Sequence, residues 1–365
     1  MVLYQKYRPQ KFSEVVGQEA IIKVLTNEIK GGQIGHAYLF SGPRGTGKTT
    51  TARILAKAIS CQTRKENEYE PCNQCQTCLE INQGKSLDLV EIDAASNRGI
   101  DEIRELKEGI KFLPTKLKYK FFIIDEAHML TREAFNALLK TLEEPPEHAI
   151  FVLATTEPHK LPATIISRCQ RFDFRRISVN DIFKKIKEIA QQEDIKISDE
   201  ALYLIAWQAE GGLRDAESLL GQILTLSDNE ITAEEVKQFL GIAGQNEITE
   251  IADLIVQKKI KEALNLIDQC IENGAEANNL GKSLISHFRW MLMLKINPDL
   301  AGKLEQQLTK DRIDAILQQG QKITSSELVR LINLLLEAVS SKNEGIIDQI
   351  SLELVVIKFL DNKSL

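Results

Sequence analysis

The stretch HAYLFSGPRGTGKTTTARILAKAIS, residues 36–60, decides the fold. It opens with a short apolar run at residues 36–40, of a length suited to a buried strand. A G-x-x-x-x-G-K-[ST] motif follows at residues 42–49, and a helix-like segment continues to about Ser60. Strand, glycine-rich loop and helix in this order form a phosphate-binding loop. The stretch therefore predicts an α/β domain that binds a nucleotide.

Each part of this loop has a chemical task. Glycines let backbone N–H groups close round the phosphates, and Lys48 reaches the β- and γ-phosphates as a point charge. The Thr49 hydroxyl is a magnesium ligand in this arrangement. The residues predicted to bind the nucleotide here are Gly42, Pro43, Arg44, Gly45, Thr46, Gly47, Lys48, Thr49 and Thr50.

Three further apolar runs follow along the first half of the chain, at residues 87–92, 120–124 and 149–154. Each precedes a polar turn and a helix-like stretch, which predicts a parallel sheet with helices on its faces. From about Ile177 the strand signals stop, and apolar residues recur at three- and four-residue spacing. This spacing predicts a small helical domain with helices at residues 181–192, 199–209, 215–226 and 233–240.

The last third of the chain has the pattern of a helical bundle. Gly241 and Gly244 interrupt the preceding pattern and mark a candidate linker. Amphipathic helices are predicted beyond it, at residues 247–273, 279–293, 325–341 and 344–361. Such a bundle either completes the fold or serves as an oligomerisation collar. The predicted domains are residues 1–176 with a cysteine module at about 61–78, a lid at 177–241 and a bundle at 242–365.

Two carboxylates end the apolar strand at residues 120–124. Asp125 and Glu126 come directly after it, at the edge where open α/β sheets bind their ligands. A strand that ends in two acids is more often only a solvated strand end. Beside a phosphate loop the catalytic interpretation prevails, with Asp125 organising magnesium and Glu126 orienting and deprotonating the attacking water.

Three more polar residues are candidates for contacts with the γ-phosphate. Thr155 ends the strand at residues 149–154, where a threonine is usually structural. Arg168 and Arg214 stand in the short motifs Ser167-Arg168-Cys169 and Gly212-Leu213-Arg214-Asp215. An isolated arginine is most often a surface cation, but these two follow a strand–Thr unit and lie in a helical lid, which favours a functional interpretation.

The six cysteines are unevenly spread. Cys61, Cys72, Cys75 and Cys78 lie within 18 residues, whereas Cys169 and Cys270 stand apart. Four thiolates at this spacing predict a closed tetrahedral zinc site, since no open position remains for catalysis. An iron–sulfur cluster would need a different run of cysteines. Four free thiols are the remaining alternative.

Composition limits the class of protein. The chain has 365 residues, of which 43% are hydrophobic and 27% charged, as in globular proteins. It holds no run of about 18 apolar residues and no signal-peptide core, so we expect a cytoplasmic protein without a membrane segment.

The net charge of −6 hides an uneven distribution. Residues 1–176 carry 26 basic and 22 acidic side chains, and residues 177–365 carry 20 and 30, so a polyanion would meet the first half. Six basic residues cluster after the second predicted strand. They are candidates for contacts with DNA, or they pair with nearby acids on a helix face: Arg98, Lys107, Lys111, Lys116, Lys118 and Lys120.

Taken together, these motifs resemble a known family. The sequence is similar to the bacterial clamp-loader ATPases of the AAA+ superfamily, the gamma/tau subunits of DNA polymerase III. The resemblance is specific over residues 1–240, and beyond them only helicity and domain order match. It rests on the motifs Tyr7-Arg8-Pro9-Gln10-Lys11-Phe12, Val15-Val16-Gly17-Gln18-Glu19, Glu91-Ile92-Asp93-Ala94-Ala95-Ser96-Asn97, Asp125-Glu126-Ala127-His128 and residues 137–146, besides the phosphate loop and the two arginine motifs.

The resemblance implies roles for individual residues. Thr155 would be the first sensor of the γ-phosphate, Arg214 the second, and Arg168 an arginine finger that reaches the ATP of an adjacent subunit. The four cysteines would hold a structural zinc. The residues that would line the adenine and ribose pocket are Arg8, Pro9, Val15 and Val16.

The resemblance also implies cofactors and partners. ATP, magnesium and zinc would be bound, and ATP hydrolysis would load the sliding clamp on primer–template DNA in a replisome associated with the nucleoid. Delta and delta-prime subunits and further copies of this chain would complete the ring, held by the collar. The chain would belong to a DNA polymerase holoenzyme, a nucleotidyltransferase, without a polymerase site of its own.

Two other functions stay open at this point. The first is another AAA+ DNA motor, such as a branch-migration helicase, against which the four-cysteine insertion argues. The second is a stator that keeps the fold without turnover. The residues that argue against the stator are Lys48, Thr49, Asp125 and Glu126.

Overall fold

The computed structural model describes residues 2–65, 67–97, 99–224, 231–300, 302, 310–340 and 348–360. The chain divides into two compact units, Met1–Ile231 and Thr232–Leu365, which are described separately. The predicted bundle begins at residue 242, ten residues later than the second unit. The limits of the three predicted domains stay predictions.

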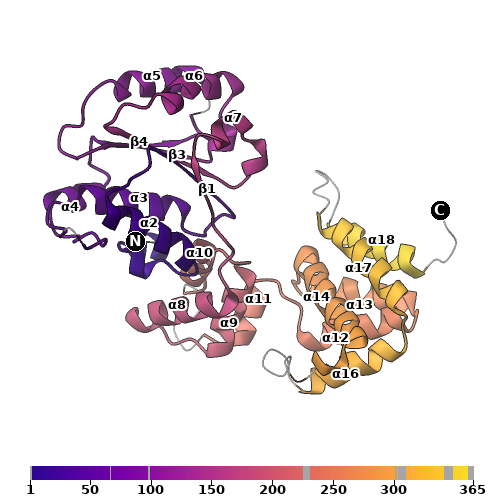
Figure 1. Cartoon of the computed structure of the whole chain (residues 1–365). Coiled ribbons are helices and arrows are strands. Elements are labelled where there is room, and N and C mark those ends of the chain that lie inside the picture. Colours follow the sequence, from indigo (N-terminus) through magenta and orange to yellow (C-terminus); the bar gives the residue numbers. More distant parts are fainter. Residues whose placement is uncertain are drawn as a thin grey trace. The chain divides into compact units, whose positions relative to one another are not determined.

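A five-stranded parallel sheet with the order β2-β3-β4-β1-β5 forms the centre of the first unit (Figure 1). β1 therefore lies between β4 and β5, and β3 lies next to β4. This confirms the α/β class, because all four predicted strands are present. The strands are β1 (Ala37–Ser41), β2 (Leu89–Asp93), β3 (Lys120–Asp125), β4 (Ala149–Thr155) and β5 (Gln170–Asp173).

The edge strand β5 escapes sequence reasoning. Phe172 is its one buried side chain, while Gln170, Arg171 and Asp173 are exposed. A strand with a single apolar residue carries no run of hydrophobic side chains. Its place is decided by pairing with β1, where Phe172 lies opposite Phe40.

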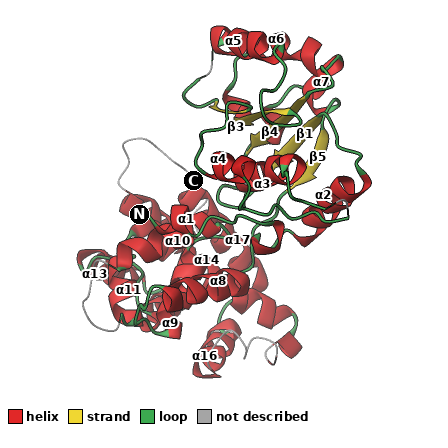
Figure 2. Ribbon diagram, turned by 90° about the vertical axis from the view of Figure 1, so that its left-hand side faces the viewer, coloured by secondary structure: helices red, strands yellow, loops and turns green. Residues whose placement is uncertain are grey.

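Helices cover both faces of the sheet (Figure 2). Alternate side chains of each strand point to opposite faces. On β1, Tyr38 and Phe40 join the core beneath α2 and α3, while Leu39 joins the core beneath α5, α6 and α7. The helices of this domain are α1 (Leu3–Lys6), α2 (Glu19–Gly31), α3 (Lys48–Ser60), α4 (Gln76–Asn82), α5 (Ile100–Ile110), α6 (Arg132–Glu143) and α7 (Ala163–Ile166).

Short 3₁₀ helices and a helical lid complete the first unit. The 3₁₀ helices are Phe12–Glu14, Ala127–Met129 and Pro158–Lys160, and the lid helices are α8 (Val179–Gln192), α9 (Asp199–Gln208) and α10 (Leu213–Ile223). Ser178 and Ser198 cap α8 and α9, since each side chain accepts a hydrogen bond from a backbone N–H of the first turn. Three of the four helices predicted for residues 177–241 form this lid, and the fourth, predicted at 233–240, is α11 (Ala233–Phe239) of the second unit.

The second unit is a helical bundle. Its helices are α11 (Ala233–Phe239), α12 (Gln245–Val256), α13 (Ile260–Glu272), α14 (Ala277–Ile296), α16 (Lys310–Gln321), α17 (Ser325–Ser340) and α18 (Asp348–Leu360), with a 3₁₀ turn at Pro298–Leu300. One large apolar cluster, with Phe288 of α14 fully buried, forms the core of the bundle.

One predicted helix of the bundle is wrong in extent. Residues 247–273 form two helices, because Lys258 adopts a positive φ of 62° and ends α12. That backbone conformation cannot continue a right-handed helix. The predicted helix at 344–361 starts before the described residues resume at 348. Within the described part it corresponds to α18 (Asp348–Leu360). Within the part of the chain that the structure describes, no helix is long and apolar enough to cross a membrane.

Candidate functional site

A pocket of 460 Å³ lies at the carboxyl ends of β1, β2 and β3, where the phosphate loop joins β1 to α3. Most of the predicted nucleotide-binding residues line it. Its lining residues are Tyr4, Arg8, Pro9, Val15, Val16, Arg44, Gly45, Thr46, Gly47, Lys48, Thr49, Thr50, Asp93, Ala95, Asp125, Glu126, Ile177, Leu213, Arg214 and Glu217. Gly42 and Pro43 stand directly before this lining, at the start of the loop.

Glycine is required at two places in the phosphate loop. Gly42 has a φ of +145°, and a Cβ there would lie 2.3 Å from the carbonyl oxygen of Phe174. Gly45 has a φ of +73°, and a Cβ there would lie 3.0 Å from the Cα of Gly212 in the lid. The loop thus packs between the end of the sheet and the start of α10, and only glycine fits.

Lys48 is folded back on its own loop. Its Nζ donates hydrogen bonds to the carbonyl oxygens of Gly42 at 2.8 Å and Pro43 at 2.7 Å, and the residue is 6% exposed. Burial lowers the pKa of Lys48, although the carboxylates of Glu126 and Asp125 raise it. A buried ammonium whose partners are neutral carbonyls would be stabilised further by an anion.

The two predicted magnesium ligands are in contact. The Thr49 hydroxyl at the start of α3 donates a hydrogen bond to Oδ2 of Asp125 at 2.7 Å. The other Asp125 oxygen accepts from the backbone N–H of Glu126 at 2.9 Å. Oxygen ligands on two elements, one of them a carboxylate, match the preference of Mg²⁺, which keeps several waters and takes few protein ligands.

Glu126 lies at a strained backbone position with a φ of +47°. Its Oε2 accepts a hydrogen bond from the Thr156 hydroxyl at 3.1 Å and lies 3.5 Å from Nδ1 of His128. The side chain is therefore held in one orientation on the wall of the pocket. A carboxylate restrained in this way meets the geometric requirement for orienting a water.

Thr155 lies behind the pocket rather than on its lining. The side chain is fully buried, and its hydroxyl contacts Nδ1 of His128 at 3.0 Å and accepts from the backbone N–H of Glu157 at 3.0 Å. Its carbonyl accepts from the N–H of Gly42 at 3.1 Å, so β4 is fastened to the phosphate loop. The sensor role of Thr155 stays a prediction.

The N-terminal segment forms another wall of the pocket. The predicted residues Arg8, Pro9, Val15 and Val16 all line it. Burial lowers the pKa of Arg8, and the nearby guanidinium of Arg53 lowers it further. A half-buried cation beside apolar side chains suits the base and sugar end of a nucleotide. Sequence reasoning missed Tyr4, which lies in the same wall.

The lid touches the phosphate loop directly. The backbone N–H of Leu213, the first residue of α10, donates to the carbonyl oxygen of Gly45 at 3.0 Å. Arg214 lines the pocket, with its guanidinium 4.7 Å from the centre of the Tyr4 ring. The predicted second sensor therefore belongs to the same pocket as Lys48. The Tyr4 ring holds it by a cation–π contact.

Glu217 is a pocket residue that sequence reasoning missed. It is 4% exposed, its Oε1 has no partner among the described residues, and burial raises its pKa to about 8 against the opposing effects of Lys185 and Arg8. The signal in the sequence is its position one turn after Leu213, on the buried face of α10. A glutamate within an apolar stripe is unusual, because acids are almost never fully buried without a partner.

Arg168 lies outside the lining of this pocket. It follows α7, forms an ion pair with Glu143 of α6, and donates to the carbonyl oxygen of Thr164 at 2.6 Å. Its side chain is 31% exposed. The structure thus does not bring Arg168 together with Lys48 within one chain.

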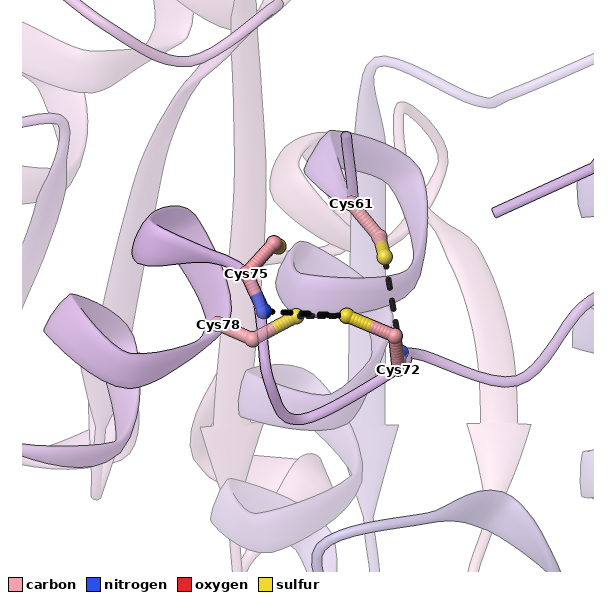
Figure 3. Close-up of side chains that lie close together, drawn as sticks. All are labelled: Cys61, Cys72, Cys75 and Cys78. Atoms are coloured by element: carbon pink, nitrogen blue, oxygen red, sulfur yellow. Dashed lines mark hydrogen bonds between the residues drawn. The ribbon is translucent and has the colours of Figure 1, made fainter. Parts of the chain in front are cut away.

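The four predicted cysteine ligands converge between α3 and β2 (Figure 3). The sulfur atoms of Cys61, Cys72, Cys75 and Cys78 all lie within 4.8 Å of one another. Four sulfurs at about 2.3 Å from a tetrahedral Zn²⁺ would lie about 3.8 Å apart, about 1 Å below this limit, so a small inward movement of the thiols fits the ion.

Backbone amides also surround the Sγ of Cys72. The N–H groups of Gln74 and Cys75 donate to it at 3.3 and 3.2 Å. Burial raises the pKa of Cys72, but hydrogen bonds from Thr63 and these two amides outweigh it and lower the pKa to about 6. The thiolate form that a metal needs is therefore favoured.

Several of the predicted DNA-contacting lysines have local partners. Lys116 pairs with Glu80 at 2.7 Å, Lys111 with Glu108 at 3.4 Å, and Lys120 donates to the carbonyl oxygen of Gly109 at 2.8 Å. Lys118 lies over the ring of Tyr119. Arg98 lies outside the described residues.

Comparison with known families accounts for nearly the whole chain. The model described as DNA polymerase III, delta subunit, matches residues 17–178, and DNA polymerase III clamp loader subunit, ATPase lid domain, matches residues 181–229. DNA polymerase III subunits gamma and tau domain III matches residues 231–365. The DNA polymerase III subunit gamma of Buchnera aphidicola is 38% identical over 88% of each chain. This chain belongs to the gamma/tau family of DNA polymerase III subunits.

Other gamma/tau relatives are longer than this chain. The DNA polymerase III subunit tau of Bacillus subtilis is 45% identical over 334 residues, which make up 91% of this chain and 58% of that relative. The chain spans about half the length of several tau and gamma/tau relatives. Among solved structures, the RuvB branch migration motor of Thermotoga maritima covers 68% of this chain at 21% identity and a TM-score of 0.47. That likeness is too slight to bear on function.

Proposed function

We propose that this gamma/tau-family chain is an ATP-hydrolysing motor subunit that loads a sliding clamp on primed DNA. The observation that carries the proposal is the Thr49–Asp125 hydrogen bond in the wall of a pocket that also holds Lys48. A cation suited to phosphate and two oxygen groups suited to Mg²⁺, all in one pocket, support this function. The family matches to a clamp-loader lid and to gamma and tau domain III support the same function.

Binding of ATP begins at the phosphate loop. The loop N–H groups and the start of α3 receive the phosphates, because helix N-termini favour anions. Lys48 then exchanges the carbonyl oxygens of Gly42 and Pro43 for phosphate oxygens. Thr49 and Asp125 would hold Mg²⁺, which neutralises charge on the phosphates when it is bound.

Glu126 supplies the base. Its carboxylate orients a water in line with the γ-phosphate and accepts a proton from it, after giving up the hydrogen bond from Thr156. The Glu126 oxygen that accepted from Thr156 then accepts a hydrogen bond from this water instead. Arg214, presented by α10, contacts the γ-phosphate from the lid, and Thr155 transmits the state of the phosphate through β4.

Arg168 acts on a neighbouring subunit in this proposal. Its position outside the lining of its own pocket supports that role, and its ion pair with Glu143 would be exchanged for phosphate contacts when subunits meet. Further copies of this chain, with delta and delta-prime subunits, form the ring, and the bundle of the second unit serves as its collar. The sliding clamp and primer–template DNA are the substrates, in the cytoplasm.

The ATPase rate of the purified chain tests this function. We expect low activity alone and strong stimulation only when delta, delta-prime, clamp and primed DNA are all present. Lys48→Ala is the matched control, because it removes the phosphate contact from the same pocket. Equal activity with and without clamp and DNA would contradict the proposed role.

A further inference from the structure

A buried lysine connects the nucleotide pocket to the cysteine module. Lys57 on α3 is 1% exposed, and its Nζ donates to the carbonyl oxygen of Gln10 at 2.9 Å and to Oε1 of Gln10 at 2.7 Å. It also donates to Oδ1 of Asn73 at 2.8 Å and Oδ1 of Asn82 at 2.7 Å. Burial of an ammonium is costly unless every N–H has a partner, and these acceptors provide them. Three separate segments therefore meet at one cation.

Asn73 belongs to the module itself, directly after Cys72. Its amide Nδ2 donates to the carbonyl oxygen of Gln10 at 3.2 Å, while its Oδ1 accepts from Lys57. Its backbone has a φ of +57°, a conformation that asparagine tolerates better than most residues. The side chain thus joins the module to the N-terminal segment.

A second contact lies on the other side of the same segment. The carboxylate of Glu70 accepts hydrogen bonds from the backbone N–H groups of Phe12 and Ser13, each at 2.8 Å. Glu70 stands two residues before Cys72. The module therefore holds residues 10–13 by hydrogen bonds to the side chains of Asn73 and Glu70.

In the sequence, residues 10–13 lie between the residues that line one wall of the nucleotide pocket. Arg8 and Pro9 precede it, and Val15 and Val16 follow it. A second cavity of 240 Å³ lies behind this wall, lined by Arg8, Pro9, Gln10, Thr50, Lys57 and Asn82 among others. The buried Phe12 ring anchors the middle of this segment in the core, whereas Arg8 and Pro9 border the second cavity. The polar contacts of Gln10, Phe12 and Ser13 to the module restrain the backbone next to Arg8 and Pro9.

We propose that the four-cysteine module positions the wall of the nucleotide site that receives the adenosine part of ATP. Glu70 and Asn73 are its positioning residues, and bound Zn²⁺ keeps them in place. The ion would join Cys61 at the end of α3, Cys72 and Cys75 in the loop, and Cys78 in α4 (Figure 3). This inference rests on the proposed function, because it assumes that the pocket binds ATP.

The test compares two ligands that differ only in adenosine. Calorimetry with Mg²⁺ would measure the Kd of ATP and of inorganic tripolyphosphate for the full chain and for the variants Glu70→Ala, Asn73→Ala and the double variant. We expect each single variant to bind ATP about tenfold more weakly, the loss of one or two hydrogen bonds. Tripolyphosphate binding should change by less than about twofold, since the phosphate loop is untouched.

The matched control is Glu68→Ala, in the same module. The Glu68 carboxylate is exposed, and its one ion pair among the described residues is with Lys65 at 3.9 Å, so its loss should change neither affinity. Metal analysis of every variant should still give one zinc per chain. Glu70→Gln, which keeps one acceptor oxygen, should give a smaller loss of ATP affinity and serves as the variant that folds if Glu70→Ala does not.

Removal of zinc from the wild-type chain provides a second route to the same readout. A chelator should weaken ATP binding and spare tripolyphosphate, with helicity followed by circular dichroism. Unchanged ATP affinity in the double variant and after removal of zinc would overturn the inference. Equal losses for the two ligands would overturn it as well, because they indicate general destabilisation. A wild-type chain that binds no ATP would instead contradict the proposed function.

Discussion

The units Met1–Ile231 and Thr232–Leu365 both have large apolar cores, but they bury polar side chains differently. Among the described residues, the first unit buries Lys48, Lys57, Asp88 and Glu217, and the second buries no acid or lysine. The buried polar residues described in the second unit are Asn279, His287 and Gln319.

Part of this difference lies at the pocket of the first unit. Burial of a charge destabilises a fold unless strong partners compensate. In the first unit Lys48 and Glu217 face a pocket, where a ligand would complete their contacts. In the second unit Nε2 of His287 bonds Oε1 of Gln319 at 2.8 Å, and Nε2 of Gln319 donates to the carbonyl of Thr249 at 2.9 Å. That chain fastens α14, α16 and α12 to one another.

The largest expected effect concerns Arg168, which should act across subunits. Arg168→Ala should bind ATP almost normally, yet the assembled complex should hydrolyse it about 10³–10⁵-fold more slowly, the range found for arginine fingers. Rings mixed from Arg168→Ala and Lys48→Ala chains should recover part of the stimulated ATPase rate. This recovery requires that some interfaces pair an intact pocket with an intact finger.

Subunit exchange in those mixtures must be verified, for example by energy transfer between labelled chains. If exchange occurs and the mixture is no more active than the sum of its two components, Arg168 acts in its own chain or has a structural role. In that case Arg168 would be one more charged residue that acts only within the first unit of its own chain.

Glu126→Gln should separate binding from hydrolysis in the first unit. The amide keeps the size of the side chain but cannot take a proton from water, so turnover should fall about 10²–10⁴-fold. ATP affinity should stay near the wild-type value because Lys48, Thr49 and Asp125 are intact. Lys48→Ala should weaken ATP binding itself. Equal loss of affinity in both variants, measured by calorimetry, would contradict these roles.

Metal analysis should find one tightly held zinc per chain, located in the first unit. Cys75→Ser should reduce it below about half an equivalent, because three thiolates no longer close the tetrahedral site. Cys169→Ser is the control, since this half-buried cysteine lies outside the cluster. Less than half an equivalent in the wild-type chain, or no loss in Cys75→Ser, would refute the zinc site.

Glu217 should make the first unit less stable as the pH rises. Its pKa is about 8 in the folded chain and near 4.5 when unfolded, so the folded state binds the extra proton between these values. The free energy of unfolding should therefore fall by about 1.4 kcal/mol per pH unit across that window through this group. Glu217→Gln should remove the slope and be the more stable form at pH 8. Urea unfolding followed by Trp207 in a Trp290→Phe background measures this unit.

His287 should give the second unit the opposite dependence on pH. Burial lowers its pKa to about 4 from an ordinary 6.5, so the unfolded state binds the extra proton between these values. Stability should therefore be complete above about pH 6.5 and fall by about 1.4 kcal/mol per pH unit as the pH drops toward 4. His287→Gln should flatten this slope. Trp290 fluorescence in a Trp207→Phe background reports unfolding of this unit. Equal slopes of unfolding free energy against pH with and without His287→Gln would refute this role of His287.

The sequence by itself determined the glycine-rich loop after the first strand, the four-cysteine cluster and the parallel sheet. These features are local, since a loop that cradles phosphate needs glycines, a lysine and a hydroxyl at fixed spacing. Four strands could be predicted because each is an apolar run of its own. The location of Asp125 and Glu126 at the pocket also followed from their place directly after such a run.

Only the tertiary structure decided what depends on contacts between distant segments. β5 exists because it pairs with β1, and one predicted long helix is two because Lys258 ends α12. Tyr4 and Glu217 come from opposite ends of the first unit's sequence and meet in one pocket. Lys57 joins Gln10, Asn73 and Asn82 through hydrogen bonds that no spacing in the sequence predicts. Burial and hydrogen bonding are properties of the folded surroundings, and a sequence pattern reports them only when neighbours along the chain are also neighbours in space.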